Sequence, residues 1–288
     1  MILQDTYHLP GGVEIPKVGL GTWMIPNASV AQAVVEAVSL GYRHIDTAQA
    51  YQNEAGVGDG VRACGLPRSE IFVTTKLAAE VKSYQEAARA IDGSLTALRL
   101  DTLDLMLIHS PWPWRRFGDA DRHFDGNREA WRALEDAHKA GKLRAIGLSN
   151  FEEPDLHNIL SSCTVRPTVN QVLAHISNTP TELIQLCQRE EILVEAYSPI
   201  AHGELLKNQA VVEMAERYGV SVPQLSIRYT LQLGLLPLPK TANPAHMKSN
   251  AEVDFVISQE DMGVLLGLPR IQDYGQASVF PVYGGKRS

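Results

Sequence analysis

The chain has 288 residues, of which 44% are hydrophobic and 20% are charged. A chain of this size can bury a large core, and α/β barrels of similar length are routinely one domain, so we expect a single domain over residues 1–288. The net charge of −7 and the pI near 5.7 lack a basic excess, so no nucleic-acid partner is expected.

The cysteine residues and the N-terminal sequence indicate the cellular compartment in which the protein is expected. Cys64, Cys163 and Cys187 are odd in number and have no CxxC spacing, which favours neither a disulfide framework nor a zinc site. The N-terminal stretch lacks the pattern of a signal peptide, and no apolar run approaches the roughly 18 residues of a membrane span. We expect a cytoplasmic protein with no membrane association.

Strand-like and helix-like segments alternate along the chain. A hairpin, Tyr7 to Leu9 and Val13 to Ile15, is expected first, covering one end of the fold. Eight strands are then predicted: Val18 to Trp23, His44 to Ala48, Ile71 to Leu77, Leu103 to His109, Ala145 to Phe151, Thr168 to Val172, Leu193 to Ser198 and Leu235 to Thr241. With helices between them, they predict a parallel sheet closed into a (β/α)8 barrel. An open doubly wound sheet is the alternative, but no GxGxxG motif opens the first unit.

Four polar residues lie at or just after the C-terminal ends of predicted strands, which is where the active sites of such barrels are found. They are Asp46, Tyr51, Lys76 and His109. Each could be structural when taken alone, but together they suit one reaction. An ammonium beside a tyrosine lowers the pKa of the phenol, and a carboxylate partner keeps a buried lysine charged. His109 could donate to an oxygen that gains negative charge. The set is suited to polarising and protonating a carbonyl.

Three sequence motifs resemble the signatures of one known protein family. GYRHIDTAQAYQNEAGVG and LEDAHKAGKLRAIGLSNF look like the first and second signatures of the aldo-keto reductase family, and LPKTANPAHMKSNAEV resembles the third. The likeness runs from about Val18 to Leu268 and is closest to the short microbial and plant-type branch. It implies a TIM barrel with a C-terminal tail, Arg270 to Ser288, folded over its mouth. It also implies a catalytic tetrad of Asp46, Tyr51, Lys76 and His109, with Tyr51 as the proton donor. The expected activity is NAD(P)H-dependent reduction of a small aldehyde, ketoester or keto sugar, by a monomer and without a metal.

The resemblance also implies the cofactor groove. Tyr197 would stack on the nicotinamide, polar side chains after two apolar strands would bind its carboxamide, and the cation and helix N-terminus at the eighth strand would bind the 2'-phosphate of NADPH. The expected cofactor residues are Gly21, Thr22, Trp23, Asp46, Ser149, Asn150, Gln171, Tyr197, Ser198, Pro199, Ile200, Leu205, Lys240, Thr241, Asn243, His246 and Asn250.

His246 departs from the family pattern, which usually has arginine there. A histidine is largely neutral at pH 7 and lacks the bidentate fork of a guanidinium, so a weaker grip on the phosphate is expected. NADPH would still be accepted through Lys240 and Thr241, with less discrimination against NADH.

The expected substrate pocket has Trp23, Tyr51, His109, Trp112 and Trp114 around it. The basic loop from Arg115 to His123 hints at acidic or polyhydroxy substrates, although a solvated charged loop is the more ordinary interpretation.

Two other functions stay open. Lys76 could form a Schiff base as in barrel aldolases, or the barrel could bind the cofactor without turnover, as a redox sensor or regulatory subunit.

Overall fold

Eight parallel strands form one sheet in the computed structural model, which describes residues 1–284; the last four residues of the expected tail lie outside the described residues. The strand order is β10-β9-β8-β7-β6-β5-β4-β3. A parallel bridge between Gly21 and Lys240 joins the two outer strands and closes the sheet into a barrel. The strands are β3 Leu20–Gly21, β4 His44–Asp46, β5 Phe72–Leu77, β6 Leu103–Ile108, β7 Leu143–Ser149, β8 Val169–Leu173, β9 Leu193–Tyr197 and β10 Leu236–Leu238. The predicted (β/α)8 barrel is confirmed.

The two strands at the closure are shorter than predicted. Pro237 lies within β10 and Pro239 directly follows it, and proline has no N–H to donate to a sheet. The closure therefore uses these residues as acceptors: Gly19 N donates to Pro237 O at 3.2 Å and Gly21 N donates to Pro239 O at 3.1 Å. The result is a closed barrel with sparse pairing at this seam.

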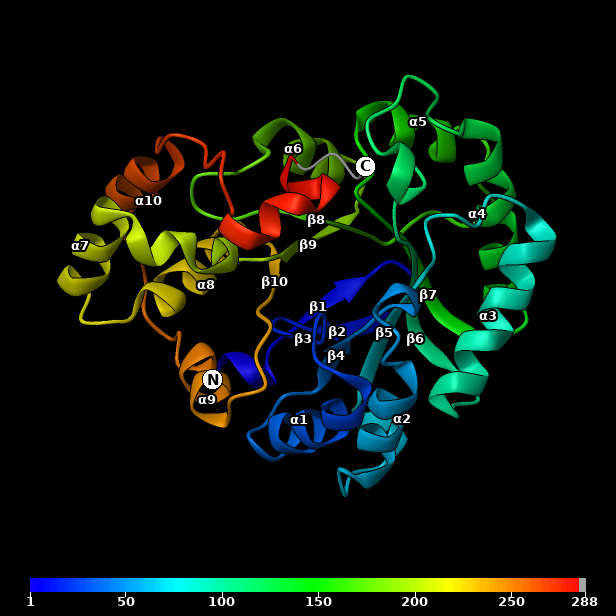
Figure 1. Cartoon of the computed structure of the whole chain (residues 1–288), viewed down its shortest axis with the longest axis horizontal. Coiled ribbons are helices and arrows are strands. Elements are labelled where there is room, and N and C mark those ends of the chain that lie inside the picture. Colours follow the sequence, from blue (N-terminus) through cyan, green and yellow to red (C-terminus); the bar gives the residue numbers. More distant parts are fainter. Residues whose placement is uncertain (285–288) are drawn as a thin grey trace.

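Helices surround the strands on the outside of the barrel (Figure 1). Their starts follow the capping residues in the sequence: Ser83 accepts from Glu86 N at the start of α3, and Ser221 with Gln224 forms a capping box at the start of α8. The helices are α1 Asn27–Ser39, α2 Glu54–Ala63, α3 Tyr84–Leu98, α4 Phe124–Lys139, α5 Glu153–Leu160, α6 Thr181–Arg189, α7 Gln209–Arg217, α8 Val222–Gln232, α9 Pro244–Ala251 and α10 Gln259–Leu266.

The N-terminal hairpin closes one end of the barrel, as predicted. Its strands are β1 Thr6–Leu9 and β2 Val13–Pro16. Leu9, Val13 and Ile15 share one buried cluster with barrel residues such as Phe72 and Leu236. Apolar side chains therefore fill this end of the barrel, and the cavity opens at the other end, where the strands finish.

The C-terminal tail lies at that open end. After α10, the chain forms the 3-10 helices Gly275–Val279 and Pro281–Tyr283, drawn in red in Figure 1. Ile271 N donates to Ser177 O at 3.1 Å, and the Tyr274 hydroxyl lies 3.0 Å from His175 Nε2. These bonds fix the tail to the loop that follows β8. None of the helices within residues 1–284 has the length and hydropathy needed to cross a membrane.

Candidate active site

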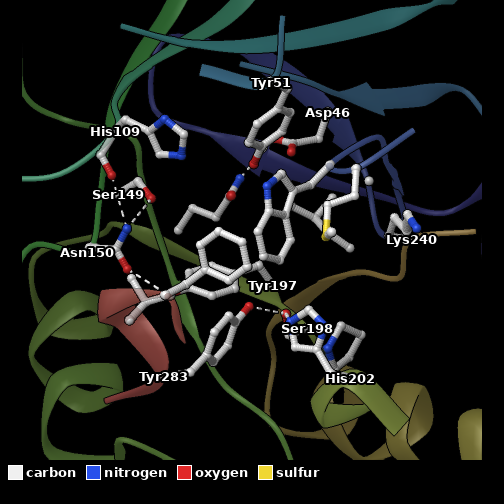
Figure 2. A pocket seen from close by; sticks show the side chains of 18 of the residues that line it. Asp46, Tyr51, His109, Ser149, Asn150, Tyr197, Ser198, His202, Lys240 and Tyr283 are labelled. Carbon is white, nitrogen blue, oxygen red and sulfur yellow. Dashed lines mark hydrogen bonds between the residues drawn. The ribbon is translucent and has the colours of Figure 1, made fainter. Parts of the chain in front are cut away.

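A cavity of about 450 Å³ opens where the strands end, between the strand-end loops and the C-terminal tail. Figure 2 shows side chains from several of these elements gathered around it. Most of the residues predicted for the site line it: Gly21, Trp23, Asp46, Tyr51, His109, Trp114, Ser149, Asn150, Gln171, Tyr197, Ser198, Pro199, Ile200 and Lys240. The strand-end rule thus brings residues from along the whole chain to one place.

Lys76 lies beneath the cavity and is fully buried. Its ammonium donates to both oxygens of Asp46, at 2.6 and 2.8 Å, and to Thr47 O at 2.9 Å. It also lies 3.3 Å from the Tyr51 hydroxyl. The cation is therefore held by one carboxylate and one carbonyl, and the phenol is the remaining group within its reach.

The electrostatics of this group differ in part from the sequence-based prediction. Burial acts to lower the pKa of Lys76, but Asp46 and Tyr51 raise it above its ordinary value, so the lysine stays charged. Burial raises the pKa of Tyr51, while Lys76 acts to lower it and Asp46 acts to raise it. The net direction for Tyr51 is upward. Lys76 acts to lower this pKa, as predicted, but the sequence did not show that burial would outweigh the attraction of an ammonium already paired with Asp46.

His109 faces Tyr51 across the cavity, with ring centroids 5.7 Å apart, and Trp114 packs edge-on against it at 4.9 Å. Burial, and then the charge on Lys76, hold the pKa of His109 well below its usual value. The ring is therefore neutral at physiological pH and carries a single N–H. Its Nδ1 has no partner among residues 1–284, so this histidine is not oriented by a carboxylate.

Beyond the phenol, three side chains offer hydrogen bonds to a ligand. The Asn150 amide donates to His109 O and Ser149 Oγ, and its oxygen accepts from the Tyr197 hydroxyl at 2.7 Å. The Gln171 amide nitrogen donates to Asp46 at 2.9 Å and to Glu195 at 2.7 Å. What remains is the Ser149 hydroxyl as donor and the Asn150 and Gln171 amide oxygens as acceptors. A carboxamide, with one carbonyl and one NH2, fits this arrangement.

Thr22, Leu205 and Trp112 are among the predicted residues that do not line the cavity. The Thr22 hydroxyl donates to Asp46 O at 2.9 Å, which holds it away from the opening. Leu205 is fully buried in a cluster with Ala201 and Val211. Trp112 turns inward: its indole N–H donates to Asp119 O at 3.0 Å, and the Arg122 guanidinium covers its ring at 4.7 Å. Of the tryptophans after His109, only Trp114 therefore reaches the cavity wall.

The proposed phosphate site lies beside the cavity on the β10–α9 connection. Lys240 lines the cavity and is exposed, and His246 is exposed on α9. Thr241 Oγ1 accepts from Asn243 N at 3.0 Å, and Asn243 Oδ1 accepts from Ala245 N at 2.9 Å. Two amides at this helix start are therefore already occupied. Asn250 is buried and does not line the cavity.

Arg116 and Arg122 in the loop after β6 form ion pairs within the loop and with its surroundings. Arg122 pairs with Asp155 and with Glu152, at 2.6 Å each. Arg116 pairs with Asp119 at 3.1 Å. These contacts fix the loop that carries Trp114, and they support the ordinary interpretation of its charges over a role in binding acidic substrates.

Several residues that line the cavity are not among the individual site residues predicted from the sequence. His202 and Gly203 come from the irregular segment after β9, and Phe280, Pro281, Val282 and Tyr283 come from the tail. The Tyr283 hydroxyl lies 2.7 Å from Ser198 Oγ, so the tail is bonded to the β9 end (Figure 2). Trp23 packs edge-on against Phe280 at 4.9 Å. No strand, cap or motif signal in the tail could have placed these side chains.

Comparison with known proteins agrees with this geometry. The model of the aldo/keto reductase family matches residues 17–267. A glyoxal reductase of Bacillus subtilis is 40% identical over 275 residues, covering 95% of this chain and 96% of the relative. An aldehyde reductase of Saccharomyces cerevisiae is 35% identical over 291 residues, covering 92% and 91%.

A solved structure agrees in fold. The Bombyx mori aldo-keto reductase in complex with NADP superposes with a TM-score of 0.84 at 31% identity, covering 98% of each chain. The chain belongs to the aldo/keto reductase family and is an oxidoreductase.

Proposed function

We propose that this protein reduces small aldehydes and ketones with NADPH and that Tyr51 is the proton donor. The observation that carries the proposal is the position of the Tyr51 hydroxyl. Tyr51 lines the cavity, and its hydroxyl lies 3.3 Å from the charged, carboxylate-paired Lys76 beneath. The bound cofactor supplies the hydride. The remaining steps belong to this chain's own residues.

The proton that completes the alcohol comes from the Tyr51 hydroxyl. Because burial raises the pKa of Tyr51, the phenol is protonated at neutral pH and ready to donate. As its oxygen gains negative charge, the adjacent Lys76 ammonium stabilises it, since that charge acts at short range from a buried position. Asp46 keeps Lys76 charged and in place. Neutral His109, 5.7 Å from the Tyr51 ring, can orient the substrate carbonyl with its one N–H.

The proposed cofactor site is the rest of the cavity. The Ser149 hydroxyl and the amide oxygens of Asn150 and Gln171 complement a nicotinamide carboxamide, and Tyr197 offers the ring face for stacking. Lys240 would meet the 2'-phosphate as a point charge. Thr241, Asn243, His246 and Asn250 stay proposals for the adenosine end, supported by their place on the same connection and helix.

The wall of the cavity suits a small substrate. Trp23, Trp114 and Phe280 bring aromatic surface around the Tyr51 and His109 polar groups. Glyoxal and simple aldehydes, the substrates after which the two relatives are named, fit this description, and ketoesters or keto sugars would test how wide the pocket is.

The test is steady-state oxidation of NADPH, and separately of NADH, with glyoxal, simple aldehydes, ketoesters and keto sugars. Turnover with small carbonyls is expected. Tight cofactor binding without turnover of any carbonyl would favour the sensor interpretation. The Schiff-base alternative has little support, because Lys76 is fully buried and its pKa is raised, and a charged ammonium is not a nucleophile.

His246→Arg is expected to raise the ratio of kcat/KM for NADPH to that for NADH by about tenfold. The guanidinium adds a charged, bidentate donor for the 2'-phosphate, and each such charged hydrogen bond contributes about 1.5 kcal/mol. NADH lacks this phosphate and should show little change. A ratio that stays at the wild-type value would place the phosphate elsewhere.

A further inference from the structure

Glu195 is a fully buried carboxyl group in the interior of the barrel, and the proposed reaction does not use it directly. It lies on β9 two residues before Tyr197, so the two side chains point to the same side of the sheet. Its Oε2 accepts from the Gln171 amide, and its Oε1 has no partner among residues 1–284. A buried carboxyl with one unpartnered oxygen is costly, and it calls for a role.

The hydrogen bonds of the Gln171 amide indicate that role. Its nitrogen has two hydrogens, and both are used, one toward Asp46 at 2.9 Å and one toward Glu195 at 2.7 Å. One hydrogen bond would let the amide turn about its side chain, but two fix its plane. The amide oxygen is then the only polar atom of Gln171 left for the cavity, and it can only accept.

We propose that Glu195 is a positioning residue: by holding the second hydrogen of the Gln171 amide, it aims the amide oxygen at the carboxamide of the nicotinamide. The inference rests on the proposed cofactor site. It assigns to a buried acid outside the tetrad a part in recognising one end of the cofactor.

The charges around Glu195 add a second consequence. Asp46 on β4 and Lys76 on β5 are the charged groups near it, Gln171 on β8 contacts it, and the neighbouring residue on β10 is Leu236. Burial, and then the Asp46 charge, raise the pKa of Glu195 to about 8. Glu195 is therefore neutral at pH 7 and gains a negative charge as the pH rises through about 8. The negative charge on Glu195 favours binding of the oxidised nicotinamide, which is a cation, over binding of the neutral reduced ring.

The experiment measures dissociation constants by fluorescence titration for NADPH, NADP⁺ and 2'-phospho-ADP-ribose, which lacks the nicotinamide. Glu195→Leu removes the acceptor and should weaken NADPH binding about tenfold, with 2'-phospho-ADP-ribose unchanged. Glu195→Gln keeps an acceptor and should restore NADPH binding to within about twofold of wild type. Glu135→Leu is the matched control. Glu135 is also buried but accepts from Thr164 N and Val165 N on the outside of the barrel, so its loss should lower Tm without changing NADPH binding.

A pH series gives an independent readout that does not need the leucine variant to fold. Between pH 7 and pH 9 the wild-type protein should gain affinity for NADP⁺ relative to NADPH by about fivefold, while Glu195→Gln should show a flat ratio. Equal pH dependence in both proteins, or NADPH binding by Glu195→Leu equal to that of wild type, would overturn the inference. Failure of the wild-type protein to bind NADPH at all would instead overturn the proposed function.

Discussion

Tyr51→Phe is expected to lower kcat/KM for carbonyl reduction by roughly a hundredfold to ten-thousandfold, the range of a lost general acid. The ring and its packing against His109 are kept, and only the hydroxyl beside Lys76 is removed. Because the cofactor contacts come from other side chains, the dissociation constant for NADPH should stay within about twofold. Steady-state kinetics and fluorescence titration of the same preparation measure both quantities.

Tyr7→Phe is the matched control for this variant. It also removes one tyrosine hydroxyl, which donates to Leu235 O at 3.2 Å near the closed end of the barrel. It should change stability slightly and leave turnover intact. If Tyr51→Phe kept more than a tenth of the wild-type kcat/KM, the proton would have to come from another group, and His109 would be the first candidate.

The pH dependence of the wild-type rate tests the same assignment. Because burial raises the pKa of Tyr51, the donor should keep its proton throughout pH 6 to 9, and the rate should not fall there through its ionisation. Because the pKa of His109 is well below its usual value, this histidine should add no inflection near pH 6.5. An inflection there that disappears in His109→Gln would contradict the neutral assignment.

The four residues that we propose for catalysis could be located from the sequence, because a parallel barrel places strand ends together whatever lies between them. Asp46, Lys76 and His109 each sit at or just after the end of an apolar run, and such runs are the clearest strand signal. Tyr51 follows in the loop of the same unit. Their convergence needed only the order of elements, and the resemblance to a family then gave the roles that we propose.

The parts that were wrong or missing depend on side-chain packing, which periodicity does not encode. Trp112 and Trp114 differ by two positions in an irregular loop, and only the cover of Arg122 and the bond to Asp119 turn Trp112 inward. The rise in the pKa of Tyr51 depends on how completely water is excluded, which a list of neighbouring charges does not give. Tyr283 reaches Ser198 from a tail with no repeating pattern.

Lys76→Met is expected to destabilise the protein by about 3–5 kcal/mol, the usual cost of leaving a buried charge without its partner. Asp46 would keep Gln171 as a donor but lose the cation 2.6 Å away, in a site where the aspartate side chain is only 4% exposed. Methionine fills much of the lysine volume, so the loss reports the charge more than a cavity. Urea denaturation measures the free energy of unfolding. Turnover should also be lost in this variant, because the ammonium beside Tyr51 is gone.

The double variant Asp46→Asn/Lys76→Met separates folding from catalysis. It removes both charges together, so it should be more stable than Lys76→Met alone, with a coupling energy of about 2 kcal/mol or more between the two positions. Turnover should remain low, because no ammonium is left to stabilise the Tyr51 oxygen. Additive losses of stability would mean that the two charges contribute to the free energy of unfolding independently. Recovered turnover would show that Tyr51 donates its proton without Lys76, and the ion pair would then serve the barrel alone.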